Sequence, residues 1–172
     1  YFHNSPWLDF NMIQTGRTLD RDNYTSILAE YCRTPVKPVL DGEPGYENVP
    51  HAFNGANPRL EALHARRFCY WALFSGACGH TYGCNDIWQF NDDAVHPSIS
   101  GSNLHWREAA ELPGANQVGH ARQIFEEIGF ESFVPAQSRI LEGLGEGLLR
   151  ARCAVGANHL ASFATTVQLL DG

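Results

Sequence analysis

The chain has 172 residues, and 44% of them are hydrophobic, which is enough for one domain with its own core. Its formal net charge is −7 and its basic residues form no stripe, which argues against a nucleic-acid partner. No apolar run is long enough to cross a bilayer, and the five cysteines are odd in number and unevenly spaced, so they predict no disulfide framework.

Predicted strands alternate with predicted helices up to about residue 130. The first strand, "LDFNMIQ", is followed by Tyr24, Ile27, Leu28 and Tyr31, whose spacing places them on one face of a helix that ends before Pro35. Such alternation predicts parallel strands joined by crossover helices. Strands are expected at 8–14, 39–42 and 77–83, and helices at 20–34, 59–75 and 116–129.

The last part of the sequence has a different pattern, with no predicted helix from Leu148 onward. The segments "LLRARCAV", "HLASFATT" and "VQLL" are typical of short strands, and "GAN" between the first two predicts a turn. This tail is therefore expected to begin an antiparallel β region.

The candidate chemistry lies at the strand ends, where each predicted strand runs into a polar, glycine-bearing turn. In parallel α/β folds the carboxyl ends of the strands carry the functional residues. The segment "KPVLDGEPGYE" brings Glu43 to such an end, between Gly42 and Pro44. Because side chains alternate along a strand, Asp41 and Glu43 are expected to share one face, with Asp41 deeper. A loop carboxylate without function is the ordinary alternative for a lone Glu.

Four aromatic residues near the predicted strand ends indicate sugar binding, because sugar rings stack on aromatic side chains while carboxyl groups act on the glycosidic oxygen. They are Trp7, Tyr46, Tyr82 and Trp88. Ordinary packing remains the alternative for each. Asp41 is either a second acid or a buried partner of a backbone amide or of an arginine, with Arg66 or Arg67 as candidates.

The segment "CGHTYGC" raises the question of zinc, through Cys78, His80 and Cys84. Their spacing matches no standard ligand pattern and no fourth ligand lies nearby, so neither a metal nor a cofactor is expected. His80 is predicted to donate a hydrogen bond to a substrate hydroxyl or to a carboxylate.

Three segments, in this order and spacing, resemble the apiosidase-like glycoside hydrolases: "WLDFNMIQTG", "KPVLDGEPGYE" and "ARRFCYWALFSGACGHTYGCNDIWQF". These are (β/α)8 TIM-barrel enzymes followed by a small β domain. The resemblance implies that residues 1–147 are the C-terminal part of the barrel, about strands six to eight, and that residues 148–172 begin the β domain. The chain would then lack the N-terminal half of the barrel, leaving it inactive and marginally stable alone.

The same resemblance implies a retaining hydrolase of plant cell-wall or pectic glycans, with Glu43 as nucleophile and an acid/base outside this sequence. Gln14, His80 and Tyr82 would bind hydroxyls or orient Glu43, while Asp41 and Arg66 would support it. Arg17 stands where the family pattern suggests His.

The resemblance favours a secreted or periplasmic location, and the alternative function is a non-catalytic carbohydrate-binding relative of the barrel family. In the enzyme that the resemblance implies, the sugar-binding subsite would be walled by Trp7, Tyr46 and Trp88.

Overall fold

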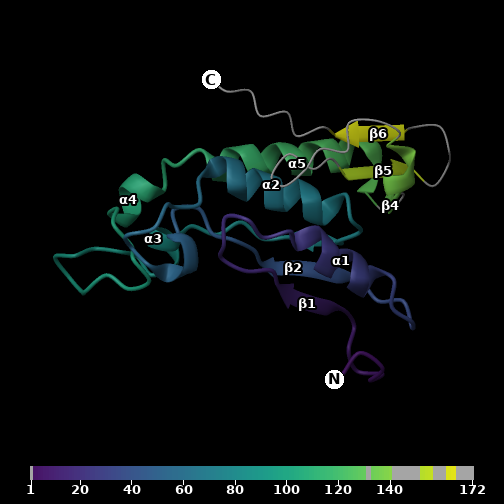
Figure 1. Cartoon of the computed structure of the whole chain (residues 1–172), viewed down its shortest axis with the longest axis horizontal. Coiled ribbons are helices and arrows are strands. Elements are labelled where there is room, and N and C mark those ends of the chain that lie inside the picture. Colours follow the sequence, from purple (N-terminus) through teal and green to yellow (C-terminus); the bar gives the residue numbers. More distant parts are fainter. Residues whose placement is uncertain (1, 131–132, 141–151, 157–161, 166–172) are drawn as a thin grey trace.

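The computed structural model describes residues 2–130, 133–140, 152–156 and 162–165. Two three-stranded sheets organise this part of the chain: a parallel one in the order β1-β2-β3 and an antiparallel one in the order β4-β5-β6. Figure 1 shows α2 between the parallel sheet and α5, with the antiparallel sheet beside one end of α5.

The parallel sheet confirms the predicted alternation of strands and helices. Its strands are β1 (Asn11–Gln14), β2 (Val39–Glu43) and β3 (Gly79–His80). Helix α1 (Asn23–Tyr31) joins β1 to β2, and α2 (Ala62–Leu73) joins β2 to β3. The carboxyl ends of the three strands therefore meet at one edge, as the sequence predicts.

Short helices occupy the segments after β2 and β3 that the sequence predicts to be irregular. They are the 3-10 helix η1 (His51–Phe53), α3 (Asn85–Trp88) and α4 (Trp106–Ala109). Helix α5 (Gly114–Ile128) begins after Pro113 and ends at Gly129, whose φ of 85° suits a glycine C-cap.

The antiparallel sheet begins earlier than expected, because β4 (Phe133–Pro135) pairs with β5 (Arg152–Gly156), which pairs with β6 (Ser162–Thr165). A 3-10 helix, η3 (Gln137–Arg139), follows β4. The strand predicted at 167–170 lies outside the described residues.

The core between the parallel sheet and its helices is built from small and branched side chains. Ile27 of α1, Val39 of β2, Ala72 of α2 and Ala77 form one buried cluster. Small residues such as Ala72 on the buried face of α2 let that helix lie close to the sheet. Burying a side chain such as Ile27 stabilises the fold by about 1.5–3 kcal/mol.

Aromatic contacts join helices α2 and α5 to the antiparallel sheet. Phe74, just after α2, packs edge-on against Phe125 of α5 with ring centroids 5.4 Å apart. Phe125 also lies 4.9 Å from Phe133 of β4, so its ring connects the helices to the antiparallel sheet. Since aromatic pairs add about 0.5–1.5 kcal/mol beyond their burial, this cluster stabilises the junction.

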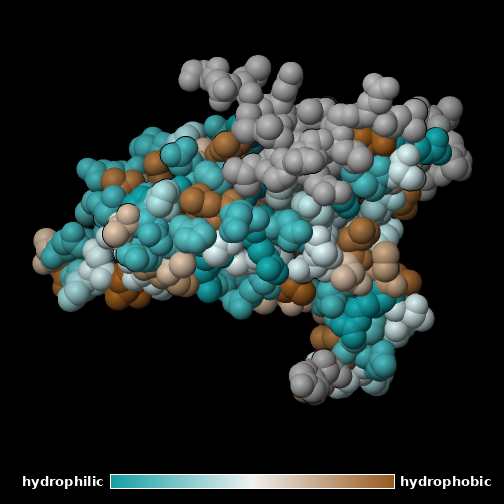
Figure 2. All heavy atoms as spheres, viewed as in Figure 1, coloured by the Kyte–Doolittle hydropathy of each residue, from teal (hydrophilic) through white to brown (hydrophobic). Residues whose placement is uncertain are grey.

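The surface in Figure 2 is mostly hydrophilic on the face shown, with apolar side chains scattered among polar ones. Met12 of β1 is exposed although its neighbours in the sheet are partly or fully buried. Among the described residues, no helix combines the length and the apolar character needed to span a membrane.

Gly45 supplies a stability test for the turn after β2. A Cβ atom there would lie 2.4 Å from Cδ2 of Leu60 and 2.6 Å from Cε2 of Phe68, both buried. We expect Gly45→Ala to lower the free energy of unfolding by about 1–3 kcal/mol in denaturant titrations of the full-length protein, because these neighbours must move. Gly119→Ala in α5, with no atom within 4 Å of its new Cβ, is the control and should be neutral or stabilising. Equal losses in both variants would contradict this account.

His64 supplies a pH test. Its Nδ1 accepts the Glu61 backbone N–H (2.9 Å) at the start of α2, and burial, assisted by Arg67, lowers the pKa of its imidazole. The unfolded chain therefore binds a proton more readily than the folded one, so stability is retained above about pH 6.5 and lost as the pH falls below it. His64→Gln should flatten this loss between pH 7.5 and 5.5 in urea unfolding, whereas the exposed control His120→Gln should not. A slope unchanged by His64→Gln would be the contrary result.

Candidate functional site

Glu43 reaches the candidate site because β2 contains a bulge. Ile13 lies opposite Asp41 and the next residue, Gln14, lies opposite Glu43, so β2 has one extra residue, Gly42, at this point. The extra residue reverses the alternation of side chains, and Glu43 therefore faces the same side as Gln14, away from Asp41. The prediction that Asp41 and Glu43 share a face is wrong for this reason.

Two donors hold the Glu43 carboxylate. Gln14 Nε2 donates to one oxygen, and Arg17 Nη2 donates to the other and forms an ion pair with it. The Glu43 side chain remains 25% exposed and that of Arg17 39% exposed, so the carboxylate is oriented but open to solvent. Charge-assisted hydrogen bonds of this kind are stronger than neutral ones, so they fix the orientation of the Glu43 carboxylate.

Glu43 opens into a pocket of about 330 Å³, within the size range of small-molecule sites. Trp88, which is 49% exposed, supplies an aromatic surface, and Tyr46 a second one. Burial and the neighbouring Glu43 charge raise the pKa of the Tyr46 hydroxyl. The complete lining is Arg17, Glu43, Tyr46, Val49, Phe53, Asn85, Trp88 and Ser100.

The Tyr46 ring can line the pocket because residue 83, against which it packs, is a glycine. A Cβ atom at residue 83 would lie 2.3 Å from Cδ1 of Tyr46, so the ring rests directly on the backbone that follows β3. The glycine in "HTYG" is therefore needed for this close approach.

Asp41 lies beneath the site and is fully buried. Its carboxylate accepts hydrogen bonds from Thr15 Oγ1 (2.9 Å) and Asn23 Nδ2 (2.9 Å), and Nδ1 of His80 lies 3.6 Å from it. Asn23 also donates to the Phe68 carbonyl (2.8 Å), so Asp41 links β1, β2 and β3 to α1 and α2.

Of the partners considered for Asp41, neither candidate arginine is found bonded to its carboxylate, which accepts from Thr15 and Asn23. Arg66 Nη1 donates instead to Gln117 Oε1 (2.8 Å), because α5 packs against α2 and offers a closer acceptor. The other candidate, Arg67, donates to the Leu19 carbonyl (2.7 Å).

Tyr82 and Trp7 are not among the residues that line the pocket. The Tyr82 hydroxyl donates to the buried carboxylate of Glu47 (2.5 Å), which also accepts the Gly114 N–H (3.2 Å). Burial and the bond to Glu47 raise the pKa of the Tyr82 hydroxyl. Trp7 is exposed and contacts Phe2, with ring centroids 5.4 Å apart.

Of the predicted site residues, the pocket thus brings together Glu43, Tyr46 and Trp88, with Gln14 bonded to Glu43. His80 lies deeper, beside Asp41. Sequence reasoning missed Phe53, Asn85 and Ser100. Phe53 ends the 3-10 helix η1 and Asn85 begins the short helix α3, and neither helix is long enough to give a periodic pattern in the sequence.

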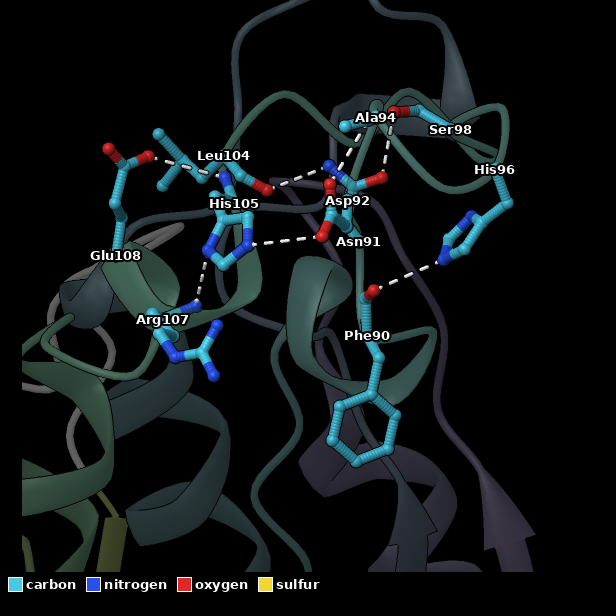
Figure 3. A network of polar contacts seen from close by, with 10 residues as sticks. All are labelled: Phe90, Asn91, Asp92, Ala94, His96, Ser98, Leu104, His105, Arg107 and Glu108. Atoms are coloured by element: carbon cyan, nitrogen blue, oxygen red, sulfur yellow. Dashed lines mark hydrogen bonds and ion pairs between the residues drawn. The ribbon is translucent and has the colours of Figure 1, made fainter.

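A polar network joins side chains and backbone groups between residues 90 and 108, in the segment that follows α3 (Figure 3). Asn91 Nδ2 donates to the Leu104 carbonyl (2.7 Å), and Ser98 Oγ donates to Asn91 Oδ1 (2.7 Å). Asn85 Nδ2 donates to the Ser100 carbonyl (3.0 Å), which fixes the segment that reaches the pocket. These bonds keep a long loop in one conformation.

The zinc hypothesis finds no support in the part of the chain that the structure describes. No three His, Cys, Asp or Glu side chains gather there closely enough to hold a metal ion. Cys84 is buried at the start of α3, and burial raises the pKa of its thiol and of the Cys78 thiol, which disfavours the thiolate form that zinc binds.

Known proteins resemble this chain over most of its length. Residues 1–132 match the family model "Apiosidase-like, catalytic domain". A solved structure named "Glycoside hydrolase" is 35% identical, with a TM-score of 0.84, and the match covers 91% of this chain and 39% of that one. A glycoside hydrolase family 5 structure from Bacteroides vulgatus ATCC 8482 is 34% identical, with a TM-score of 0.85, over 91% of this chain and 37% of that one. No curated protein sequence matches.

Asp41 supplies the stability test for the site. Asp41→Ala should lower the free energy of unfolding by about 2–4 kcal/mol, because Thr15 Oγ1 and Asn23 Nδ2 would lose a buried acceptor. Denaturant unfolding of the full-length protein measures the loss. Asp9→Ala, at an exposed position, is the control and should change stability by less than about 0.5 kcal/mol. A loss at Asp41 no larger than at Asp9 would contradict the linking role.

Proposed function

Because this chain belongs to the apiosidase-like family, we propose that the protein it forms part of hydrolyses glycosidic bonds with Glu43 as the nucleophile. The observation that carries the proposal is the Glu43 carboxylate, held by Gln14 and Arg17 at the carboxyl end of β2 and open to an aromatic-lined pocket. A fixed, accessible carboxylate beside an exposed Trp88 is what attack on a sugar ring requires.

We propose a retaining mechanism. Glu43 attacks the anomeric carbon while a carboxylic acid protonates the leaving oxygen, and water then hydrolyses the glycosyl-enzyme with the same acid acting as base. That second carboxyl group would lie about 5 Å from Glu43 and come from outside this sequence. Gln14 and Arg17 orient the attacking carboxylate and stabilise its charge when it departs.

The proposed setting is a (β/α)8 barrel of which β1, β2 and β3 are strands six, seven and eight. The chain spans 39% and 37% of the two solved relatives, so most of such a barrel would come from elsewhere in the protein. Met12 is exposed on the sheet face opposite the helices, where a barrel interior would enclose it. The second domain would start near residue 133, at β4, earlier than the predicted residue 148.

The proposed substrates are pectic or other plant cell-wall glycans. The pocket supports a sugar-sized ligand, since Trp88 and Tyr46 offer rings for stacking while Asn85 and Ser100 offer polar groups for hydroxyls. A non-catalytic carbohydrate-binding protein would use the same surface without turnover.

The test compares wild-type full-length protein with Glu43→Gln on a panel of pectic oligosaccharides, by measuring released sugar. Glutamine keeps the size of the side chain and its contacts with Gln14, but it is not a nucleophile. We expect the hydrolysis rate to fall by about a thousandfold or more while binding of oligosaccharide is retained. Glu30→Gln, on the surface of α1, is the control and should keep full activity.

Two results would contradict the proposal. Activity that survives Glu43→Gln would assign the nucleophile elsewhere. A wild-type protein that binds the oligosaccharides without releasing sugar would instead support the carbohydrate-binding alternative.

A further inference from the structure

Strained backbone conformations gather in the loops that surround the pocket. In the described part of the chain, five non-glycine residues have a positive φ, between 49° and 60°, and each of these follows β2 or β3. Two of them, Phe53 and Ser100, line the pocket itself. Positive φ is tolerated by asparagine but is a genuine outlier for a bulky side chain. The five are Asn48, Ala52, Phe53, Phe90 and Ser100.

Phe53 is held in this conformation by the segment around it. Ala52 donates its backbone N–H to the Arg17 carbonyl (3.3 Å), and the Leu19 N–H donates to Nδ1 of His51 (3.2 Å). Asn57 Nδ2 donates to the His51 carbonyl (3.0 Å). These bonds fasten η1 to the loop after β1, so the strain at Phe53 persists because its surroundings fix it.

The Phe53 ring gains little from burial in return for this strain. The residue is 42% exposed, and in the described part of the chain it belongs to none of the buried hydrophobic clusters. The Arg17 guanidinium lies over the Phe53 ring, 4.7 Å from the ring centroid. A strained, exposed aromatic beside Glu43 is therefore better explained by ligand binding than by folding.

We propose that Phe53 is a substrate-binding residue, whose ring contacts the apolar face of a sugar bound at Glu43 and which sets the affinity of the pocket together with Trp88. This inference rests on the proposed function for the identity of the ligand. The position of Phe53 also makes it a support for Arg17, since the guanidinium lies over its ring while donating to Glu43.

Phe90 provides a matched control. It is also an exposed phenylalanine with a positive φ, 49°, but it packs edge-on against Trp106 and is not among the residues that line the pocket. Glycine relieves the backbone strain at either position and removes the ring. Phe53→Gly and Phe90→Gly therefore differ mainly in whether the lost ring faces the pocket.

The experiment measures the affinity of pectic oligosaccharides by calorimetry, in full-length protein that carries Glu43→Gln, and kcat/KM in protein that retains Glu43. We expect Phe53→Gly to weaken binding about tenfold and to raise KM by a similar factor, with a thermal midpoint equal to or above that of wild type. Phe90→Gly should leave affinity and kcat/KM unchanged. Phe53→Leu, which keeps apolar volume but loses the ring face, should also weaken binding and serves if the glycine variant fails to fold.

The outcomes separate this inference from the proposed function. Hydrolysis by wild type with unchanged affinity and kcat/KM in both Phe53 variants would overturn the role of Phe53 and leave the function standing. Binding without hydrolysis would overturn the hydrolase proposal, and a tenfold loss of affinity in the Phe53 variants would still support the role of Phe53. Neither binding nor hydrolysis of any oligosaccharide would overturn both.

Discussion

The buried carboxylate of Asp41 is the constraint on which the arrangement of the sheet and its helices depends. A carboxylate without access to water is stable in a protein only when donors surround it. Here the donors are Thr15 after β1 and Asn23 at the start of α1, and Nδ1 of His80 in β3 lies 3.6 Å from the same carboxylate. Asn23 also donates to the Phe68 carbonyl of α2. The contacts around the Asp41 carboxylate therefore relate the positions of five elements, namely β1, β2, β3, α1 and α2.

The position of Glu43 follows from this fixed point. With Asp41 held toward the helices, regular alternation would direct Glu43 toward the helices too. The bulge at Gly42 reverses that direction within one residue, and Gln14 and Arg17 then complete the orientation from the neighbouring strand end. The carboxylates of Asp41 and Glu43, two residues apart, thus lie in opposite environments. Asp41 is buried and accepts hydrogen bonds, whereas Glu43 faces the pocket.

The sequence predicts the three strands of the parallel sheet, the longer helices α1, α2 and α5, and Glu43 at a strand end, because these depend on local periodicity and on turn residues. It does not predict the short helices α3 and α4 or the strand β4. It does not predict the bulge, since register depends on the partner strand. It likewise fails for the partners of Arg66 and Tyr82, because Gln117 and Glu47 become acceptors only after packing brings them close. Phe53 gives no signal at all in the sequence: its exposure and its backbone angle exist only in the folded loop.

The residues that stabilise the fold and the residues proposed to bind the ligand therefore occupy different parts of a strand and the loop that follows it. Val39 and Asp41 of β2 are buried and committed to packing or hydrogen bonding. Beyond the strand ends the pattern is reversed, with exposed aromatic residues and positive φ angles held by polar networks instead of apolar burial. Hydrogen bonds constrain geometry more sharply than apolar contacts do, because they depend on direction as well as distance. A rim built in this way can keep side chains exposed to a ligand and still hold them in one conformation, which is the property that preorganised binding requires.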